Sequence, residues 1–322
     1  MTSKERVLAT IHHQEPDRVP LDVWMYREDV QKKVIEKWGS LDEFYEALNT
    51  DMFLAYTPSA NSFSRKFGSI DEILDLKFRN PDEERLYTGV NQGLLECGVK
   101  EAVKKYGNEK AIFGEVIGVL ENAQSFLGIE NLLMEMALHK KKVKELFQRL
   151  SAWSAKVAEN VIDLGVDVLQ ISDDWGENKK LLFSPKDWWE LIYLNIKKIA
   201  DVGKKKGLPI SLHSDGCIWE VMDGIIKMGI NVIHPVQASA GMDHAKFKEK
   251  YGNKLCLYGG LDITHTLPYG TEEEIINEVK REMEILKPGG GFIFCSAHAI
   301  QPDTDLSKVQ TAYKSALMYG KY

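Results

Sequence analysis

Two histidines that lie beside acidic residues are the side chains of this sequence best suited to metal binding or catalysis. His213 ends one apolar run, Asp215 lies two residues later, and His298 lies three residues beyond another apolar run. Two imidazole nitrogens and a carboxylate oxygen suit zinc or a similar divalent metal. The candidate metal ligands are His213, Asp215, His298 and Glu115, the last within a third apolar run.

A pair of adjacent acids, Asp173 and Asp174, follows the apolar run 166–171 and begins a long polar segment. A carboxyl group in a cleft can donate or accept a proton during catalysis. Either acid could instead cap a helix or brace its loop, and Asp215 could likewise be only an N-cap. The candidate catalytic residues are Asp173, Asp174, His213 and His298.

Aromatic and polar side chains near the ends of other apolar runs are candidates for binding a substrate. They are Tyr26, Tyr56, Trp175, Glu177 and Gln237. An aromatic ring can stack on such side chains. His234, which precedes a proline, is interpreted as structural, and Cys295 as a small core residue. Few lysines or arginines follow the apolar runs, so the charges of a substrate with several negative groups would be poorly compensated.

Eight short runs rich in β-branched and aliphatic residues recur along the chain, each followed by a helical pattern. They cover residues 19–24, 52–56, 111–117, 166–171, 210–213, 231–234, 255–258 and 292–295. This alternation predicts an α/β fold with a parallel sheet, and eight units predict a closed (β/α)8 TIM barrel formed by one domain, 1–322. An open doubly wound sheet is the alternative, but no G-x-G-x-x-G follows any run. In a barrel, the candidate site residues would meet at the carboxyl-end rim.

One long segment interrupts the regular alternation. Residues 57 to about 98 contain turn signals and no clear period, and they predict an insertion after the second strand that could contain a hairpin. An irregular segment of this length between a strand and its helix more often has a function than not. After the third strand, the spacing of apolar residues predicts two helices, at about 129–138 and 140–164.

Composition narrows the class of protein. The chain has 322 residues, 44% hydrophobic and 28% charged, with a formal net charge of -7, which argues against a nucleic-acid partner. Its four cysteines are far apart, which fits neither a disulfide framework nor a zinc ribbon and is natural for a reducing cytoplasm. No run approaches the roughly 18 apolar residues of a membrane span. Composition leaves a homodimer open.

Several motifs together resemble the uroporphyrinogen decarboxylase superfamily over essentially the whole chain. The motifs are Arg6-Val-Leu-Ala, Pro16-Asp-Arg-Val-Pro, His213-Ser-Asp-Gly, Asn231-Val-Ile-His-Pro-Val-Gln, Ala240-Gly-Met-Asp, Tyr258-Gly-Gly-Leu-Asp, Gly289-Gly-Gly-Phe and His298-Ala-Ile-Gln-Pro-Asp-Thr. They are specific to the superfamily and less so to any one activity. The resemblance implies a (β/α)8 barrel, in agreement with the number of predicted strands.

The resemblance implies different chemistry for the two branches of this superfamily. True decarboxylases carry an arginine-rich segment after the first strand that holds the acidic groups of a porphyrinogen, but residues 24–29 of this chain contain a single arginine, Arg27. Without bidentate anchors, a polyanionic tetrapyrrole would be uncompensated. Cobalamin-dependent methyltransferases instead hold zinc with a His-x-Cys pair and a late cysteine. Here His213 matches, while Asp215 and His298 stand in the cysteine positions.

Replacing thiolates with harder ligands favours an oxygen-bearing substrate over a thiol. The resemblance therefore implies a corrinoid-dependent methyltransferase that takes a methyl group from an O-methyl donor, such as a methoxylated aromatic. No Asp-x-His-x-x-Gly motif is present, so cobalamin would be carried by a separate corrinoid protein. Two alternatives remain: a decarboxylase-like lyase acting on a smaller carboxylic acid, and a binding protein that has kept the barrel without the chemistry.

Overall fold

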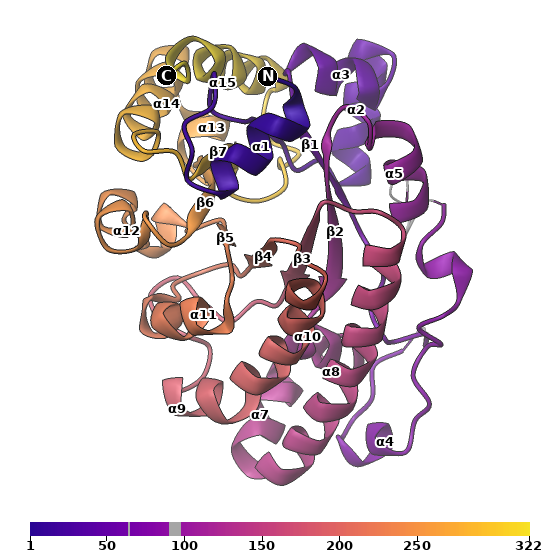
Figure 1. Cartoon of the computed structure of the whole chain (residues 1–322). Helices are drawn as coiled ribbons and strands as arrows, with labels where there is room; N and C mark the ends of the chain where they lie inside the picture. Colours follow the sequence, from indigo (N-terminus) through magenta and orange to yellow (C-terminus); the bar gives the residue numbers. More distant parts are fainter. Residues whose placement is uncertain (64, 90–97) are drawn as a thin grey trace.

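Seven parallel strands form the centre of the molecule and follow one another in sequence order around a curved sheet (Figure 1). The computed structural model describes residues 1–63, 65–89 and 98–322. The strands are β1 (Met52–Ala55), β2 (Ala111–Ile117), β3 (Val168–Ser172), β4 (Ile210–His213), β5 (Val232–His234), β6 (Cys256–Leu261) and β7 (Phe292–Ser296). Nearly all of their residues are buried, which explains why they are continuous apolar runs rather than alternating ones. The predicted α/β class and parallel sheet are confirmed.

The first predicted strand, 19–24, lies between β7 and β1 but pairs only through an isolated bridge. The Phe294 N–H donates to the Pro20 carbonyl at 2.9 Å, and the Phe294 carbonyl accepts from Asp22 at 3.0 Å. On the other side, the Asp51 N–H donates to the Leu21 carbonyl at 2.7 Å. A regular ladder does not form because Pro20 has no N–H and because the Leu21 N–H bonds the Asp51 carboxylate at 2.8 Å.

Helices lie outside the sheet, and the two termini are at the same end of the molecule (Figure 1). The helices are α1 (Ser3–Ile11), α2 (Glu28–Trp38), α3 (Leu41–Ala47), α4 (Asp71–Leu74), α5 (Val99–Tyr106), α6 (Val119–Leu127), α7 (Ile129–Leu138), α8 (Lys140–Asp163), α9 (Pro185–Asp187), α10 (Tyr193–Lys205), α11 (Met222–Met228), α12 (His244–Tyr251), α13 (Thr266–Tyr269), α14 (Glu272–Leu286) and α15 (Leu306–Tyr319). Within the described parts of the chain, none of the helices combines the length and apolar character needed to cross a bilayer.

The two helices predicted after the third strand are confirmed as α7 and α8, but α6 was not predicted. Gly118 and Gly128 flank α6, and its amino end has no capping side chain nearby in sequence. The cap is Asp173, whose Oδ1 accepts the N–H groups of Leu120 at 2.7 Å and Glu121 at 3.0 Å. A cap from a distant part of the chain leaves no local sequence signal.

The segment after β1 packs against α6. The Ala60 N–H donates to Oδ1 of Asn122 at 2.7 Å, and the Phe67 N–H donates to the Phe126 carbonyl at 2.8 Å. Residues 57–63 and 65–89 hold α4 and one short 3-10 turn, Glu84–Leu86, and within these ranges there is no strand. Residues 90–97, which belong to the predicted insertion and its hairpin, lie outside the described residues.

Candidate functional site

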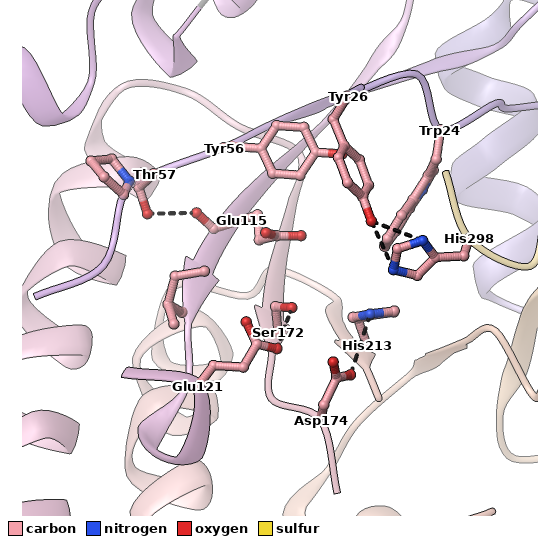
Figure 2. A pocket seen from close by; sticks show the side chains of 12 residues that line it. Trp24, Tyr26, Tyr56, Thr57, Glu115, Glu121, Ser172, Asp174, His213 and His298 are labelled. Carbon is pink, nitrogen blue, oxygen red and sulfur yellow. Dashed lines mark hydrogen bonds and ion pairs between the residues drawn. The ribbon is translucent and has the colours of Figure 1, made fainter. Parts of the chain in front are cut away.

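A cavity of about 310 Å³ opens at the carboxyl ends of the strands (Figure 2). Residues from or just after β1, β2, β3, β4 and β7 form its walls, as barrel geometry requires. The lining residues are Trp24, Tyr26, Tyr56, Thr57, Pro58, Glu115, Ile117, Glu121, Ser172, Asp174, His213 and His298. These twelve described residues include three large aromatic side chains, three carboxyl groups and two imidazoles, but no lysine or arginine.

Three of the four predicted metal ligands come together at this cavity. His298 Nε2 lies 3.4 Å from Asp215 Oδ2, and His213 Nε2 lies 3.9 Å from Asp215 Oδ1. One ligand atom from each residue lies within 4.8 Å of the others. Zinc bonds of about 2.0–2.1 Å in a tetrahedron would place ligand atoms roughly 3.3 Å apart, so small side-chain movements suffice. The donor set therefore fits zinc, with a position left for another ligand.

His234 determines which ring nitrogen of His213 carries the hydrogen. Burial lowers the pKa of His234, so its ring is neutral. His234 Nε2 lies 3.3 Å from the Ser296 carbonyl, which only accepts, so this nitrogen carries the hydrogen. His234 Nδ1 is then an acceptor, and it lies 2.8 Å from Nδ1 of His213, which must be the donor. His213 Nε2 therefore presents a lone pair to the cavity, as a metal ligand requires.

The lone pair of His213 Nε2 faces two carboxyl groups. His213 Nε2 lies 3.5 Å from Asp174 Oδ1 and 3.9 Å from Asp215 Oδ1. Burial lowers the pKa of His213 to about 3 and that of His298 to about 4, so both rings are neutral near pH 7. Burial, with a smaller effect from Asp174, raises the pKa of Asp215 to about 8. Neutral nitrogens and buried acids gathered in this way would be stabilised by a divalent cation.

Tyr26 connects the aromatic wall to the histidines. Its hydroxyl lies 2.7 Å from Nε2 and 2.9 Å from Nδ1 of His298 (Figure 2). Its ring lies edge-to-face with those of His298 and Tyr56, at centroid distances of 5.4 and 5.8 Å. Burial raises the pKa of Tyr26, so the hydroxyl keeps its proton. Tyr26 and Tyr56 both line the cavity, where they were predicted to contact a substrate.

The two adjacent acids have different surroundings. Asp173 is fully buried, and its carboxylate accepts the N–H groups of Leu120 and Glu121. Asp173 is therefore a helix cap that does not line the cavity, contrary to its predicted position at the site. Asp174 does line the cavity, and its Oδ1 accepts the Asp215 N–H at 2.9 Å. Burial raises the pKa of Asp174, which favours the protonated acid.

Three residues predicted to bind substrate do not reach this cavity. Trp175 is fully buried and packs edge-to-face on Trp188, with ring centroids 5.4 Å apart. Glu177 lies on a separate hollow beside the rim. Gln237 braces the loop after β4, because its Oε1 accepts the Gly216 N–H at 2.9 Å. The sequence placed these side chains after strands but could not show which way each one points.

Glu115 lines the cavity but does not join the metal-ligand cluster, contrary to the prediction. Its Oε2 accepts from Gln170 Nε2 at 3.0 Å. Glu121, which the sequence analysis missed, lines the same cavity, and its Oε1 accepts from the Ser172 hydroxyl at 2.9 Å. Its position four residues after β2 could have indicated a cavity residue, but only together with the prediction that a helix, α6, begins directly after that strand.

Comparisons with known proteins identify the family and the fold. The family model described as uroporphyrinogen decarboxylase (URO-D) matches residues 66–317. The uroporphyrinogen decarboxylase of Chlorobium phaeovibrioides is 30% identical over 167 residues, covering 48% of this chain and 44% of that protein. The match therefore spans less than half of that relative's length.

Methyltransferases are also among the similar proteins. The methylcobamide:CoM methyltransferase MtbA of Methanosarcina acetivorans is 24% identical over 227 residues, covering 69% of this chain and 63% of that protein. A solved structure described as a methyltransferase from Methanosarcina mazei superposes with a TM-score of 0.69 at 16% identity, covering 99% of both chains. At that identity, the superposition shows a shared fold.

Proposed function

This chain belongs to the uroporphyrinogen decarboxylase family, and within that family we propose that it is a corrinoid-dependent methyltransferase. Its substrate would be an O-methyl donor such as a methoxylated aromatic, and the methyl group would pass to the cobalt of a separate corrinoid protein. We propose that it acts in the cytoplasm. The observation that carries the proposal is the cluster of His213, Asp215 and His298 beside an aromatic cavity without lysine or arginine.

The cavity is better suited to a single aromatic ring than to a porphyrinogen. Its volume of about 310 Å³ is at the small end of the range for ligand pockets. A porphyrinogen carries many carboxylates, and none of the described lining residues is a cation that could pair with them. Arg27, the single arginine within residues 24–29, lies 2.9 Å from Asp29. Trp24, Tyr26 and Tyr56 supply the faces and edges on which a ring can pack.

Methyl transfer from an ether needs help at the departing oxygen. As the C–O bond breaks, the oxygen would keep the bonding electrons and a proton would convert the phenoxide into a phenol; the corrinoid protein, as methyl acceptor, would supply the electron pair for the new bond to carbon from its cobalt(I). A zinc ion held by His213, Asp215 and His298 would supply Lewis-acid polarisation of that oxygen. Asp174 is the proposed proton donor because it lines the cavity and its buried carboxyl keeps a raised pKa.

Substitution of Asp174 tests its role as the proton donor. Asp174→Asn should lower the rate of methyl transfer by roughly 10²- to 10⁴-fold, the usual contribution of a general acid. Formation of methylcobalamin from cob(I)alamin and 2-methoxyphenol measures the rate, in the presence of zinc. Glu177→Gln, on the separate hollow, is the matched control and should keep the wild-type rate. A wild-type rate in Asp174→Asn would remove this residue from the mechanism.

The second candidate is a lyase that decarboxylates a small acid. It is favoured by the similarity to uroporphyrinogen decarboxylases and by the buried Asp174 and His298, which could handle a proton. The cavity argues against it, because no described lining residue offers a cation to a substrate carboxylate. Release of carbon dioxide from a carboxylic acid without any corrinoid would replace the methyltransferase proposal with this one.

A further inference from the structure

Besides Asp174, two carboxyl groups outside the metal-ligand cluster face the cavity, Glu115 from β2 and Glu121 from the first turn of α6. Figure 2 shows Glu121 across the cavity from His298. Within the described residues, neither carboxyl forms an ion pair with a lysine or arginine. Buried acids without a counter-charge are unfavourable as anions, so their protonation and their hydrogen bonds decide what they can bind.

The hydrogen bonds of Glu115 leave a donor facing the cavity. The Ser211 hydroxyl donates to Gln170 Oε1 at 3.1 Å, and Gln170 Nε2 donates to Glu115 Oε2 at 3.0 Å. Burial raises the pKa of Glu115 to about 8, so the group is a neutral acid near pH 7. With Oε2 already accepting, Oε1 is the oxygen available to carry the proton.

Glu121 is arranged in the same way. The Ser172 hydroxyl donates to Oε1 at 2.9 Å, which leaves Oε2 available to carry the proton. Burial and the nearby acids raise the pKa of Glu121. The Asp173 carboxylate fixes the backbone of Glu121 through the N–H bond at the start of α6. Each acid therefore offers one O–H donor and retains acceptor capacity.

We propose that Glu115 and Glu121 determine specificity by hydrogen-bonding an uncharged hydroxyl substituent of the substrate ring and by disfavouring rings that carry a carboxylate. This inference rests on the proposed function, because it names the substrate class of the same cavity. A phenolic hydroxyl both donates and accepts, so it can satisfy a neutral acid in either direction. A carboxylate substituent would bring a negative charge into a cavity whose described lining residues include no lysine or arginine, and burying a charge without a counter-charge is unfavourable.

Three ligands that share one ring test this selectivity. Binding of 2-methoxyphenol, methoxybenzene and 2-methoxybenzoate to the zinc-loaded full chain would be measured by titration calorimetry at pH 7. The wild type should bind 2-methoxyphenol roughly tenfold or more tightly than either of the others, because methoxybenzene has no hydroxyl to hydrogen-bond the acids and 2-methoxybenzoate would bury a charge without a cation. Equal or tighter binding of 2-methoxybenzoate, or no binding of any of the three, would overturn the proposal.

Substitutions assign the preference to the two acids. Glu115→Leu and Glu121→Leu should each reduce the preference for 2-methoxyphenol over methoxybenzene to near unity. Glu115→Gln should keep it, because the amide still donates and accepts. Glu177→Gln is the control outside the cavity and should retain the full ratio. If the Leu variants fail to fold, the wild-type ratios and Glu115→Gln still decide the matter.

Binding and turnover separate this inference from the proposed function. The expected ligand preference without methyl transfer from any donor would contradict the function and leave the role of Glu115 and Glu121 intact. Methyl transfer with a preference for 2-methoxybenzoate would contradict the role of the two acids and leave the function intact.

Discussion

The imidazole of His213 is held in one tautomer by a chain of hydrogen bonds that begins outside the cavity. The Ser296 carbonyl accepts from His234, and His234 accepts from His213, so the free nitrogen of His213 faces the acids. His234 also stacks on Trp24, with ring centroids 4.0 Å apart and planes 12° apart. Hydrogen-bond partners behind a metal-binding histidine set both the orientation and the basicity of its ring.

His234→Ala tests this chain. The substitution removes the acceptor for His213 Nδ1 and should weaken zinc binding roughly 10- to 100-fold, the usual effect of losing an outer partner. Competition with a chelator of known zinc affinity measures the change. His139→Ala, an exposed histidine paired with Glu135, is the matched control and should leave zinc affinity unchanged. Unaltered affinity in His234→Ala would show that this hydrogen bond does not prepare the ligand.

At the residue scale, the sequence predicted which residues meet in the candidate metal cluster better than it predicted the positions of the neighbouring acids. His213, Asp215 and His298 meet because they end or follow strands, and strand order is readable from apolar runs. Asp173 and Asp174 are adjacent, and only the distant amino end of α6 determines that one caps a helix while the other faces the cavity. Such a contact, 53 residues away in sequence, has no local pattern.

The element that organises one wall of the cavity is α6. Gly118 precedes it, and a Cβ atom at that position would lie 2.5 Å from Cγ of Asp173. The close approach lets the Asp173 carboxylate reach the amino end of α6, and this in turn places Glu121. A glycine at this position is therefore required by packing, although its φ is an ordinary negative one.

Gly118→Ala should destabilise the protein by about 1–3 kcal/mol, the range for forcing extra volume into a packed site. Urea unfolding followed by circular dichroism measures the change. Gly68→Ala is the control, because the nearest atom to its added Cβ is the flexible end of Glu72 at 3.3 Å. Equal stabilities for the two variants would contradict the close packing of Gly118 on Asp173.

Most of the secondary structure could be predicted because apolar runs mark buried strands. β2 and β4 have the predicted bounds, and the other named strands differ at their ends by a few residues. The sequence could not show that residues 19–24 form an irregular segment, since the pairing there is interrupted by a proline and a side chain from elsewhere. It also could not identify α6, whose cap is remote in sequence.

At the scale of the whole molecule, the segment between β7 and β1 is secured by a buried ionic network. Asp51 is fully buried and lies 2.7 Å from Arg6 and 2.6 Å from Arg18. Arg6 also lies 2.7 Å from Asp17. This network joins α1 to the start of β1 and to the segment that follows α1. It therefore links the amino-terminal residues to the closure of the sheet.

The network predicts a pH dependence of stability. The hydrogen bond from Arg6 is the main reason that the pKa of Asp17 falls from 3.8 to about 2. Because the pKa is lower in the folded state, ionised Asp17 stabilises that state fully above pH ~4, and the effect fades as pH falls toward 2. Asp17→Asn should be less stable than wild type at pH 6, and the gap should shrink as pH drops below 4.

Urea unfolding at a series of pH values checks this expectation. Glu284→Gln, at an exposed position of α14, is the control and should show no comparable convergence with wild type. A gap between Asp17→Asn and wild type that stays constant from pH 6 to pH 3 would show that the charge of Asp17 does not stabilise the fold.

The proposed mechanism depends on the metal site. The zinc content of the purified protein is the most direct test of that site. Elemental analysis of the wild type, His213→Ala, His298→Ala and the His139→Ala control should give about one zinc per chain in the first and last. The two site variants should lose it, because each removes one nitrogen ligand from the cluster. A wild type that takes up no zinc, or site variants that keep it, would contradict a metal centre at His213, Asp215 and His298.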